Sequence, residues 1–149
     1  MKMISELLDS DNPPTLTLKP RPGILSIVKI RSRMRALPGL SGSRREAALG
    51  LLYLWHDHWP AAHDVAQAHE GEPDFDLLHA IGHRREGDYE NSIYWFRAAG
   101  KHPAFSRPGK KWDPEAFVRA VQAKPEDPAL RAAQAEEMKT FFAWLTAKA

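Results

Sequence analysis

Residues 74–103 read DFDLLHAIGHRREGDYENSIYWFRAAGKHP, and this stretch decides the fold because it holds two helices with clear start and stop signals. Asp74 follows a proline and can cap a first helix over about residues 75–86. Gly87 suits the left-handed residue just past the end of that helix. Asp88 can cap a second helix over about residues 89–99. Two helices joined so tightly predict an antiparallel hairpin.

A second hairpin precedes this one. Ser43 and Glu46 form a capping box for a helix over about residues 44–55, and this helix is apolar all round from Ala47 onward, which predicts a central place in the core. Trp59 and a following proline then start a helix that runs toward Gly71. Shifting this hairpin by 30 residues lays LLYLWHD on IGHRREG. The sequence therefore indicates a duplicated unit, shorter than the usual 34-residue tetratricopeptide repeat.

The C-terminal part predicts two more helices after a basic loop over residues 101–111. Asp113 and Asp127 are each followed by proline and can cap helices that end near residues 121 and 147. The last helix would be about 30 Å long and could brace both hairpins. The predicted fold class is all-α: stacked antiparallel helical hairpins, as a tetratricopeptide-like repeat or an irregular bundle, with C-terminal bracing helices.

The composition limits the chemistry that the chain can carry. It has 149 residues and no cysteine, which fits one domain and excludes disulfides, thiolate metal sites and thiol nucleophiles. The longest apolar run, residues 47–55, is far below the roughly 18 residues of a membrane span. Acidic residues near the N-terminus are untypical of a secretory or mitochondrial signal. We therefore expect a cytoplasmic protein with no membrane contact.

Residues 1–40 form a basic, proline-rich arm, and residues 41–149 are predicted to form a single helical domain. Residues 12–45 contain eight Lys or Arg and no acid. Four prolines within residues 13–22 favour an extended or disordered chain. Residues 24–37 fit a helix or a strand, and the helix is favoured by length. A solvated leader is the simpler interpretation of the charge; a nucleic-acid contact is the less favoured one, because no aromatics are interleaved.

Histidine clustering is the main chemical signal, because all seven histidines lie between residues 56 and 102. His79 and His83 are four residues apart on the predicted helix over 75–86 and share a face with Asp76 and Glu86. Such a pair can present two imidazole nitrogens to one metal ion. The zincin motif is absent, since Ala80 stands in place of its glutamate.

A third ligand would have to come from the first hairpin. If that hairpin faces the His79–His83 stripe, His63 is the first candidate, and Asp64 or His56 are others. The result would be an open zinc or manganese site that activates water. Two other interpretations stay open. In one, these residues are the polar side of an amphipathic helix, or buried histidines that are hydrogen-bonded to a carboxylate. In the other, they line a groove that binds a ligand. Arg84 and Arg85 favour the helix C-terminus electrostatically, and as a pair they could also clamp a carboxylate or phosphate.

The phrases LLYLWHDHWPAAHDVAQ and HAIGHRREGDYENSIYWFRAAGKHP resemble an uncharacterised family of small bacterial and fungal proteins with a WHD, AHD, HAIxHRRExDYxN, YWFR, GxHP motif series. The resemblance covers about residues 47–105 and implies a helical, tetratricopeptide-like protein. If the family has a functional site, its motif residues here are His56, Asp57, His63, Asp64, His79, His83, Arg84, Arg85, Glu86, Asp88, Asn91 and Arg97.

The sequence thus predicts a helical binding or interaction module that uses this His/Asp/Arg-rich face for an unidentified small-molecule or protein ligand. A metal-dependent hydrolase with a site between the two hairpins is the first alternative. A nucleic-acid accessory protein that acts through the basic arm is the second.

Overall fold

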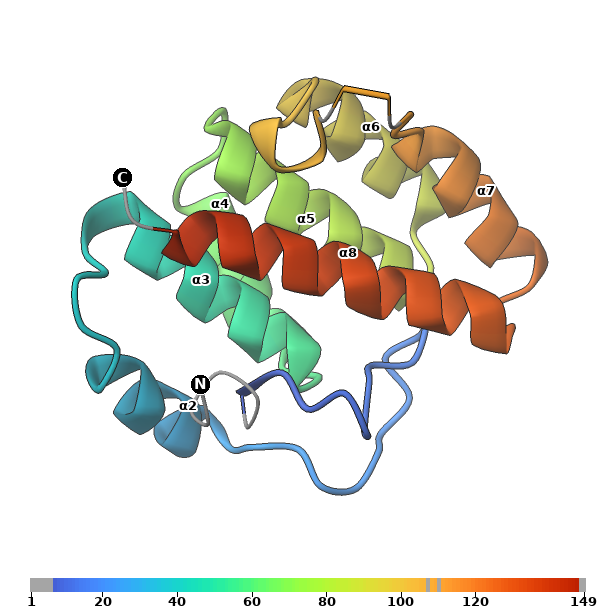
Figure 1. Cartoon of the computed structure of the whole chain (residues 1–149). Coiled ribbons are helices and arrows are strands. Elements are labelled where there is room, and N and C mark those ends of the chain that lie inside the picture. The colour runs from blue at the N-terminus through green and yellow to red at the C-terminus, as the bar shows by residue number, and fades with distance from the viewer. Residues whose placement is uncertain (1–6, 107, 110, 148–149) are drawn as a thin grey trace.

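The computed structural model describes residues 7–106, 108–109 and 111–147, and within them the chain is all-α with no strand. Neighbouring helices pack largely as antiparallel pairs (Figure 1), which confirms the predicted fold class. In chain order the elements are α2 (Ile27–Arg35), α3 (Gly42–Trp55), α4 (Trp59–Gln67), α5 (Pro73–Glu86), α6 (Tyr89–Ala99), the short 3-10 helix η1 (Pro103–Phe105), α7 (Pro114–Ala123) and α8 (Pro128–Thr146).

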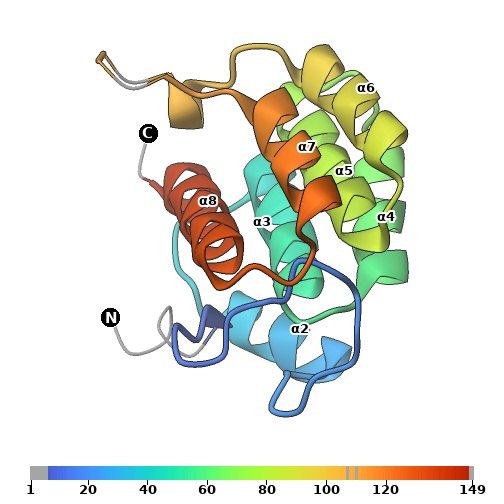
Figure 2. The same cartoon turned by 90° about the vertical axis from the view of Figure 1, so that its right-hand side faces the viewer.

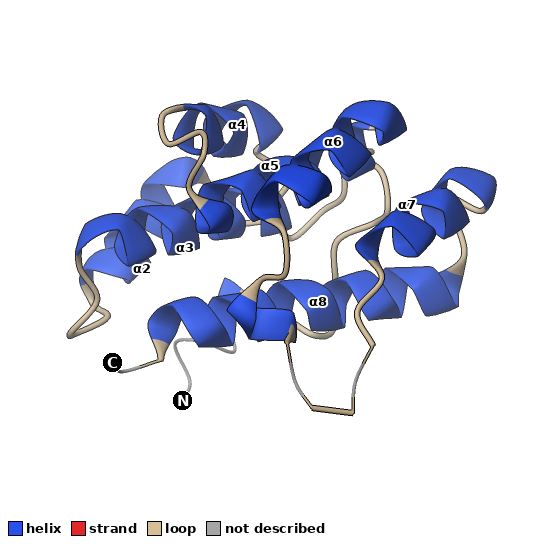
Figure 3. Cartoon of the chain, turned by 90° about the horizontal axis from the view of Figure 1, so that it is seen from above, coloured by secondary structure: helices blue, strands red, loops and turns tan. Residues whose placement is uncertain are grey.

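The two predicted hairpins are α3–α4 and α5–α6, and they meet where α4 packs against α5. Figure 2 shows α3 between α8 on one side and the layer of α4, α5 and α6 on the other. The same layers are seen from above in Figure 3. The C-terminal helix α8 runs along α3, and α7 lies against α6. This arrangement places α4 and α5 side by side, which matters for the histidines that both helices carry.

Two helices, α3 and α5, form the centre of the core, whereas the sequence predicted a central place for α3. The predicted core helix α3 is buried at residues 47–48 and 50–55, as expected from its apolar sequence. Helix α5 is buried at every position from 75 to 85, including its histidines and arginines. The polar residues at positions 76, 79 and 83–85 therefore do not form a solvent-facing side of α5. Its neighbours α3, α4 and α6 cover it, and its charged side chains find partners inside the protein.

Most helix boundaries follow the capping signals in the sequence. Asp88, Asp113 and Asp127 each accept a hydrogen bond from a backbone N–H in the first turn of the helix that follows. Gly87 ends α5 with a φ of 89°, in the left-handed region. Two expected caps are wrong. Helix α5 begins at Pro73, so Asp74 lies inside it, and α3 begins at Gly42, so Ser43 lies inside that helix as well.

The described part of the N-terminal arm packs against the helices. Residues 27–35 form a helix, as favoured from the sequence, and bury Ile30 and Met34. Leu7 and Leu8 are also buried and belong to the same core as the hairpins. A solvated leader is therefore the wrong interpretation for residues 7–35, because burying these apolar side chains stabilises the folded arm. No helix of the described residues has the length and apolar character needed to cross a bilayer.

Candidate metal centre

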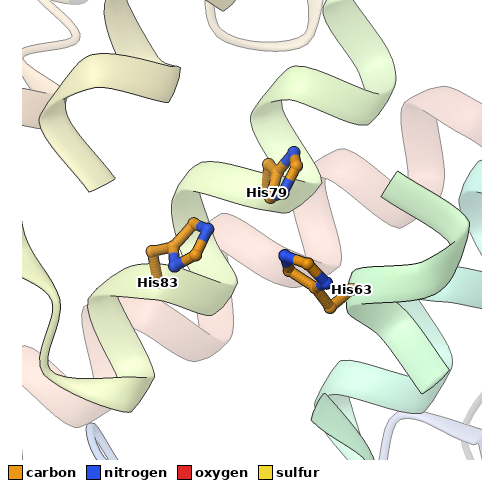
Figure 4. Close-up of side chains that lie close together, drawn as sticks. All are labelled: His63, His79 and His83. Atoms are coloured by element: carbon orange, nitrogen blue, oxygen red, sulfur yellow. The ribbon is translucent and has the colours of Figure 1, made fainter. Parts of the chain in front are cut away.

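Three histidines converge where α4 meets α5 (Figure 4). His79 and His83 lie one helical turn apart on α5, and His63 faces them from α4. One ring nitrogen from each lies within 4.8 Å of the other two. The His79 and His83 rings stack at 5.1 Å between centroids, and the His63 ring meets them edge-on at 4.9 and 5.6 Å. The two hairpins thus assemble one cluster, as the sequence predicted.

Two tryptophans form walls around the three histidines. Trp95 of α6 stacks on His79 with ring centroids 4.1 Å apart, and Trp59 lies edge-on to both His63 and His83 at 5.0 and 5.2 Å. These rings cover part of the cluster, and a lower local dielectric strengthens the interaction of an ion with its ligands. The tryptophans also hold the imidazoles in defined orientations.

The two nitrogens of His83 have different partners. Its Nδ1 lies 2.5 Å from the Oε1 atom of Glu86, one turn further along α5. The other carboxylate oxygen of Glu86 accepts a hydrogen bond of 2.9 Å from the indole N–H of Trp59. The side-chain amide of Asn91 lies 3.3 Å from Nε2 of His83. Both oxygens of the Glu86 carboxylate are therefore engaged, one with His83 and the other with Trp59.

His79 is the most deeply buried member of the cluster. Its side chain is buried, with the residue 2% exposed. Its Nδ1 atom has no hydrogen-bond partner among the residues that the structure describes. Burial, assisted by the neighbouring His83 and His63, lowers the pKa of His79 to about 4. The imidazole is therefore neutral at physiological pH, which is the form that binds a metal ion.

The depressed pKa values of His79 and His56 predict acid sensitivity. Burial also lowers the pKa of His56 to about 4, whereas a histidine in the unfolded chain titrates near 6.5. Between these values the unfolded chain binds protons that the folded protein does not, so stability falls as the pH drops from about 6.5 to 4. We expect urea midpoints to decrease steadily across this range and to level off above about pH 7.5. A urea midpoint that stays constant from pH 7.5 to 4.5 would contradict the predicted acid sensitivity.

Arg84, Arg85 and Asp57 lie in buried ion pairs away from the three histidines. Arg84 binds Glu137 of α8 through both terminal nitrogens, at 3.0 and 2.6 Å. Arg85 pairs with Asp57 at 2.8 Å and also donates to the backbone carbonyls of residues 15 and 17. Both arginines are thus engaged in holding the C-terminal helix and the N-terminal arm. Ligand binding by these three residues stays a prediction.

The remaining motif residues lie outside the cluster of three. His56 has both nitrogens engaged, because Nδ1 accepts from the Leu25 N–H and Nε2 contacts the Leu7 carbonyl. Asp64 is exposed. Arg97 pairs with Glu115 on the surface. The contacts of His56 and Arg97 give these two residues structural explanations that need no ligand.

A second group that could hold an ion shares one histidine with the first. It consists of His83, Glu86 and Asp88, whose ligand atoms also lie within 4.8 Å of one another. Glu86 and Asp88 are exposed, Glu86 already binds His83 and Trp59, and Asp88 caps α6. The buried group of three imidazoles is therefore the better candidate.

The basic arm has fewer available cations than its sequence suggests. Arg21 pairs with Asp57, and Arg31 donates to the Tyr53 hydroxyl. Just beyond the arm, Arg45 donates to a backbone carbonyl. Phosphate binding depends on cations that are accessible. These internal contacts favour the histidine cluster over the arm as the functional site.

Trp59, Gly82 and Trp95 are parts of the site that sequence reasoning did not single out. A Cβ built on Gly82 would lie 1.8 Å from the Trp59 ring, so the indole occupies the space where a side chain would be. The available signal was spacing: Trp59 lies four residues before His63, which places both on one face of α4.

Comparisons with known proteins yielded no match to a family model, to a curated protein or to a solved structure.

Proposed function

We propose that this protein is a helical metal-binding module in which His63, His79 and His83 hold one divalent transition-metal ion. The observation that carries the proposal is the buried His79 Nδ1 without a hydrogen-bond partner, inside a group of three imidazoles within 4.8 Å. A buried polar atom without a partner is costly, and an ion bound by this group would stabilise it. The neutral state of His79 supports the same conclusion, because metal ligands must be deprotonated.

The chemistry of the three ligands favours zinc over manganese. Imidazole suits zinc, copper, nickel and iron, whereas manganese prefers oxygen ligands. Zinc–nitrogen bonds of about 2.0–2.1 Å place tetrahedral ligands about 3.3 Å apart, so an ion would draw the ligand nitrogens closer by at most about 1.5 Å from their separation of up to 4.8 Å. Small changes in side-chain rotation on two helices can supply this movement.

Hydrolysis is the second candidate function, and the number of ligands favours it. Three protein ligands leave a fourth zinc position free, which is the arrangement of catalytic rather than structural zinc sites. A water molecule in that position would become a nucleophile near neutral pH. Zinc-dependent cleavage of an activated ester, lost in His79→Ala, would support this candidate. If His79→Ala cleaves the ester as fast as the wild type, hydrolysis at this site is excluded.

Zinc titration tests the metal-binding proposal directly. We expect tag-free protein to bind one equivalent at pH 7.5, and His63→Ala to weaken binding at least tenfold because it removes one of three ligands. Because the His63 side chain is only half-buried, its replacement should leave the fold intact. His69→Ala is the matched control, since His69 pairs with Glu72 on the surface. Absence of saturable binding by the wild type would overturn the proposal.

Acid pH should release the metal. Ligand imidazoles must lose their protons to bind, and a free histidine titrates near 6.5. The zinc affinity is therefore expected to fall steeply below about pH 6. Calorimetry at pH 7.5 and 5.5 measures this change, and equal affinity at both values would argue against imidazole ligands.

A further inference from the structure

We propose that Glu86 is a positioning residue of the metal centre: it holds His83 with the proton on Nδ1, so that the lone pair of Nε2 faces the ion. This inference rests on the proposed function above. It assigns a role to a carboxylate that does not itself belong to the group of three histidines.

The hydrogen-bond geometry fixes which nitrogen of His83 carries the proton. A carboxylate can only accept, and Oε1 of Glu86 lies 2.5 Å from Nδ1, so Nδ1 is the protonated atom. In a neutral imidazole the other nitrogen is then an acceptor. The amide of Asn91, 3.3 Å from Nε2, is placed to donate to that lone pair in the absence of an ion. The metal-facing atom of His83 is therefore Nε2.

Glu86 is itself held in place by a chain of contacts. Its second oxygen accepts from the Trp59 indole, and the Trp59 ring fills the space above Gly82, directly before His83 in the sequence. Trp59 thus joins α4 to α5 on the side of the cluster where Glu86 lies. Carboxylates that accept from the second nitrogen of a metal-bound histidine fix its orientation and raise its basicity, and their loss usually lowers metal affinity 10- to 100-fold.

Glu86→Gln tests the proposal with little change in shape. Two N–H donors, from His83 and Trp59, converge on Glu86, but glutamine offers one acceptor oxygen and one amide group that can only donate. We expect zinc affinity to fall about 10- to 100-fold. Glu72→Gln is the matched control, because Glu72 contacts Nδ1 of His69 with the same three-residue spacing, at 3.0 Å and on the surface. That control should bind zinc as tightly as the wild type.

Nitrogen NMR of the metal-free protein supplies a readout that a purely structural role would not move. The His83 signals should report a protonated Nδ1 in the wild type and a mixture of tautomers in Glu86→Gln. Suppose that the wild type binds zinc and that Glu86→Gln has the same zinc affinity and the same His83 tautomer. This result would overturn the role of Glu86 but not the metal site. If the wild type binds no zinc, the proposed function fails, and the tautomer measurement alone decides whether Glu86 sets the protonation of His83.

Discussion

Asp57→Asn is expected to lower the free energy of unfolding by about 3–5 kcal/mol, because it leaves a buried guanidinium without its countercharge. The Arg85 side chain is fully buried, and Asp57 is its only carboxylate partner among the described residues. Burial already lowers the pKa of Arg85 to about 10, and the pairing with Asp57 opposes that shift. Arg21 loses the same partner. Asparagine tolerates the left-handed backbone of this position, where φ is 66°, so the charge is the main change.

Glu115→Gln is the matched control for this substitution. It makes the same carboxylate-to-amide change in a pair of nearly equal length, 2.7 Å to Arg97 compared with 2.8 Å between Asp57 and Arg85. The side chains of Arg97 and Glu115 are 70% and 42% exposed, so solvent screens this pair and its loss should lower the stability far less. Urea denaturation of both variants measures the difference. If Asp57→Asn and Glu115→Gln lower the free energy of unfolding by equally small amounts, the ion pair of Arg85 and Asp57 does not hold the arm to the hairpins.

Gly82→Ala is expected to destabilise the protein by about 1–3 kcal/mol, although alanine is normally the better helix former. The new methyl group would meet the Trp59 ring at 1.8 Å, and a rigid indole cannot turn away as an aliphatic chain can. Displacing Trp59 would also remove the hydrogen bond that it donates to Glu86. We therefore expect weaker zinc binding together with the loss of stability. Thermal unfolding and zinc titration of the same sample measure the two effects.

Gly50→Ala provides the comparison for Gly82→Ala. Gly50 is also buried within a helix, but its nearest contact, at 2.5 Å, is the end of the flexible Leu78 side chain. Its substitution should cost less stability and leave zinc binding unchanged. The combination of Gly82→Ala with Trp59→Phe should recover part of the lost stability, because a smaller ring leaves room for the methyl group. Additive losses in the double variant would contradict the proposed steric cause.

The motif HAIGHRRE divides its residues between two tasks in the folded protein. The histidines face α4 and form the candidate metal centre, while Arg84 and Arg85 hold α8 and the N-terminal arm. Consecutive residues on a buried helix point in different directions, so one short motif can serve a site and the packing around it. We infer that substitution of the arginines alters stability first and metal binding only through the fold.

Local sequence signals determined the helices of this protein. Asp88, Asp113 and Asp127 start helices because a short carboxylate can accept from the N–H groups of the first turn, and Gly87 ends one because glycine readily adopts positive φ. The apolar run around residues 47–55 identified α3 as a core helix. The four-residue spacing of His79 and His83 places both on one helix face, and this spacing alone identified them as candidate metal ligands.

Tertiary structure alone decided which polar residues meet. Sequence periodicity describes one helix at a time, so it could not show which polar residues of α5 are buried. The helix is buried because α3, α4 and α6 pack around it. Partners such as Glu137 for Arg84 and the backbone of residues 15 and 17 for Arg85 lie more than 50 positions away in the chain. Trp59 reaches Glu86 only across the α4–α5 interface. Long-range contacts of this kind depend on how helices dock, and no local pattern encodes them.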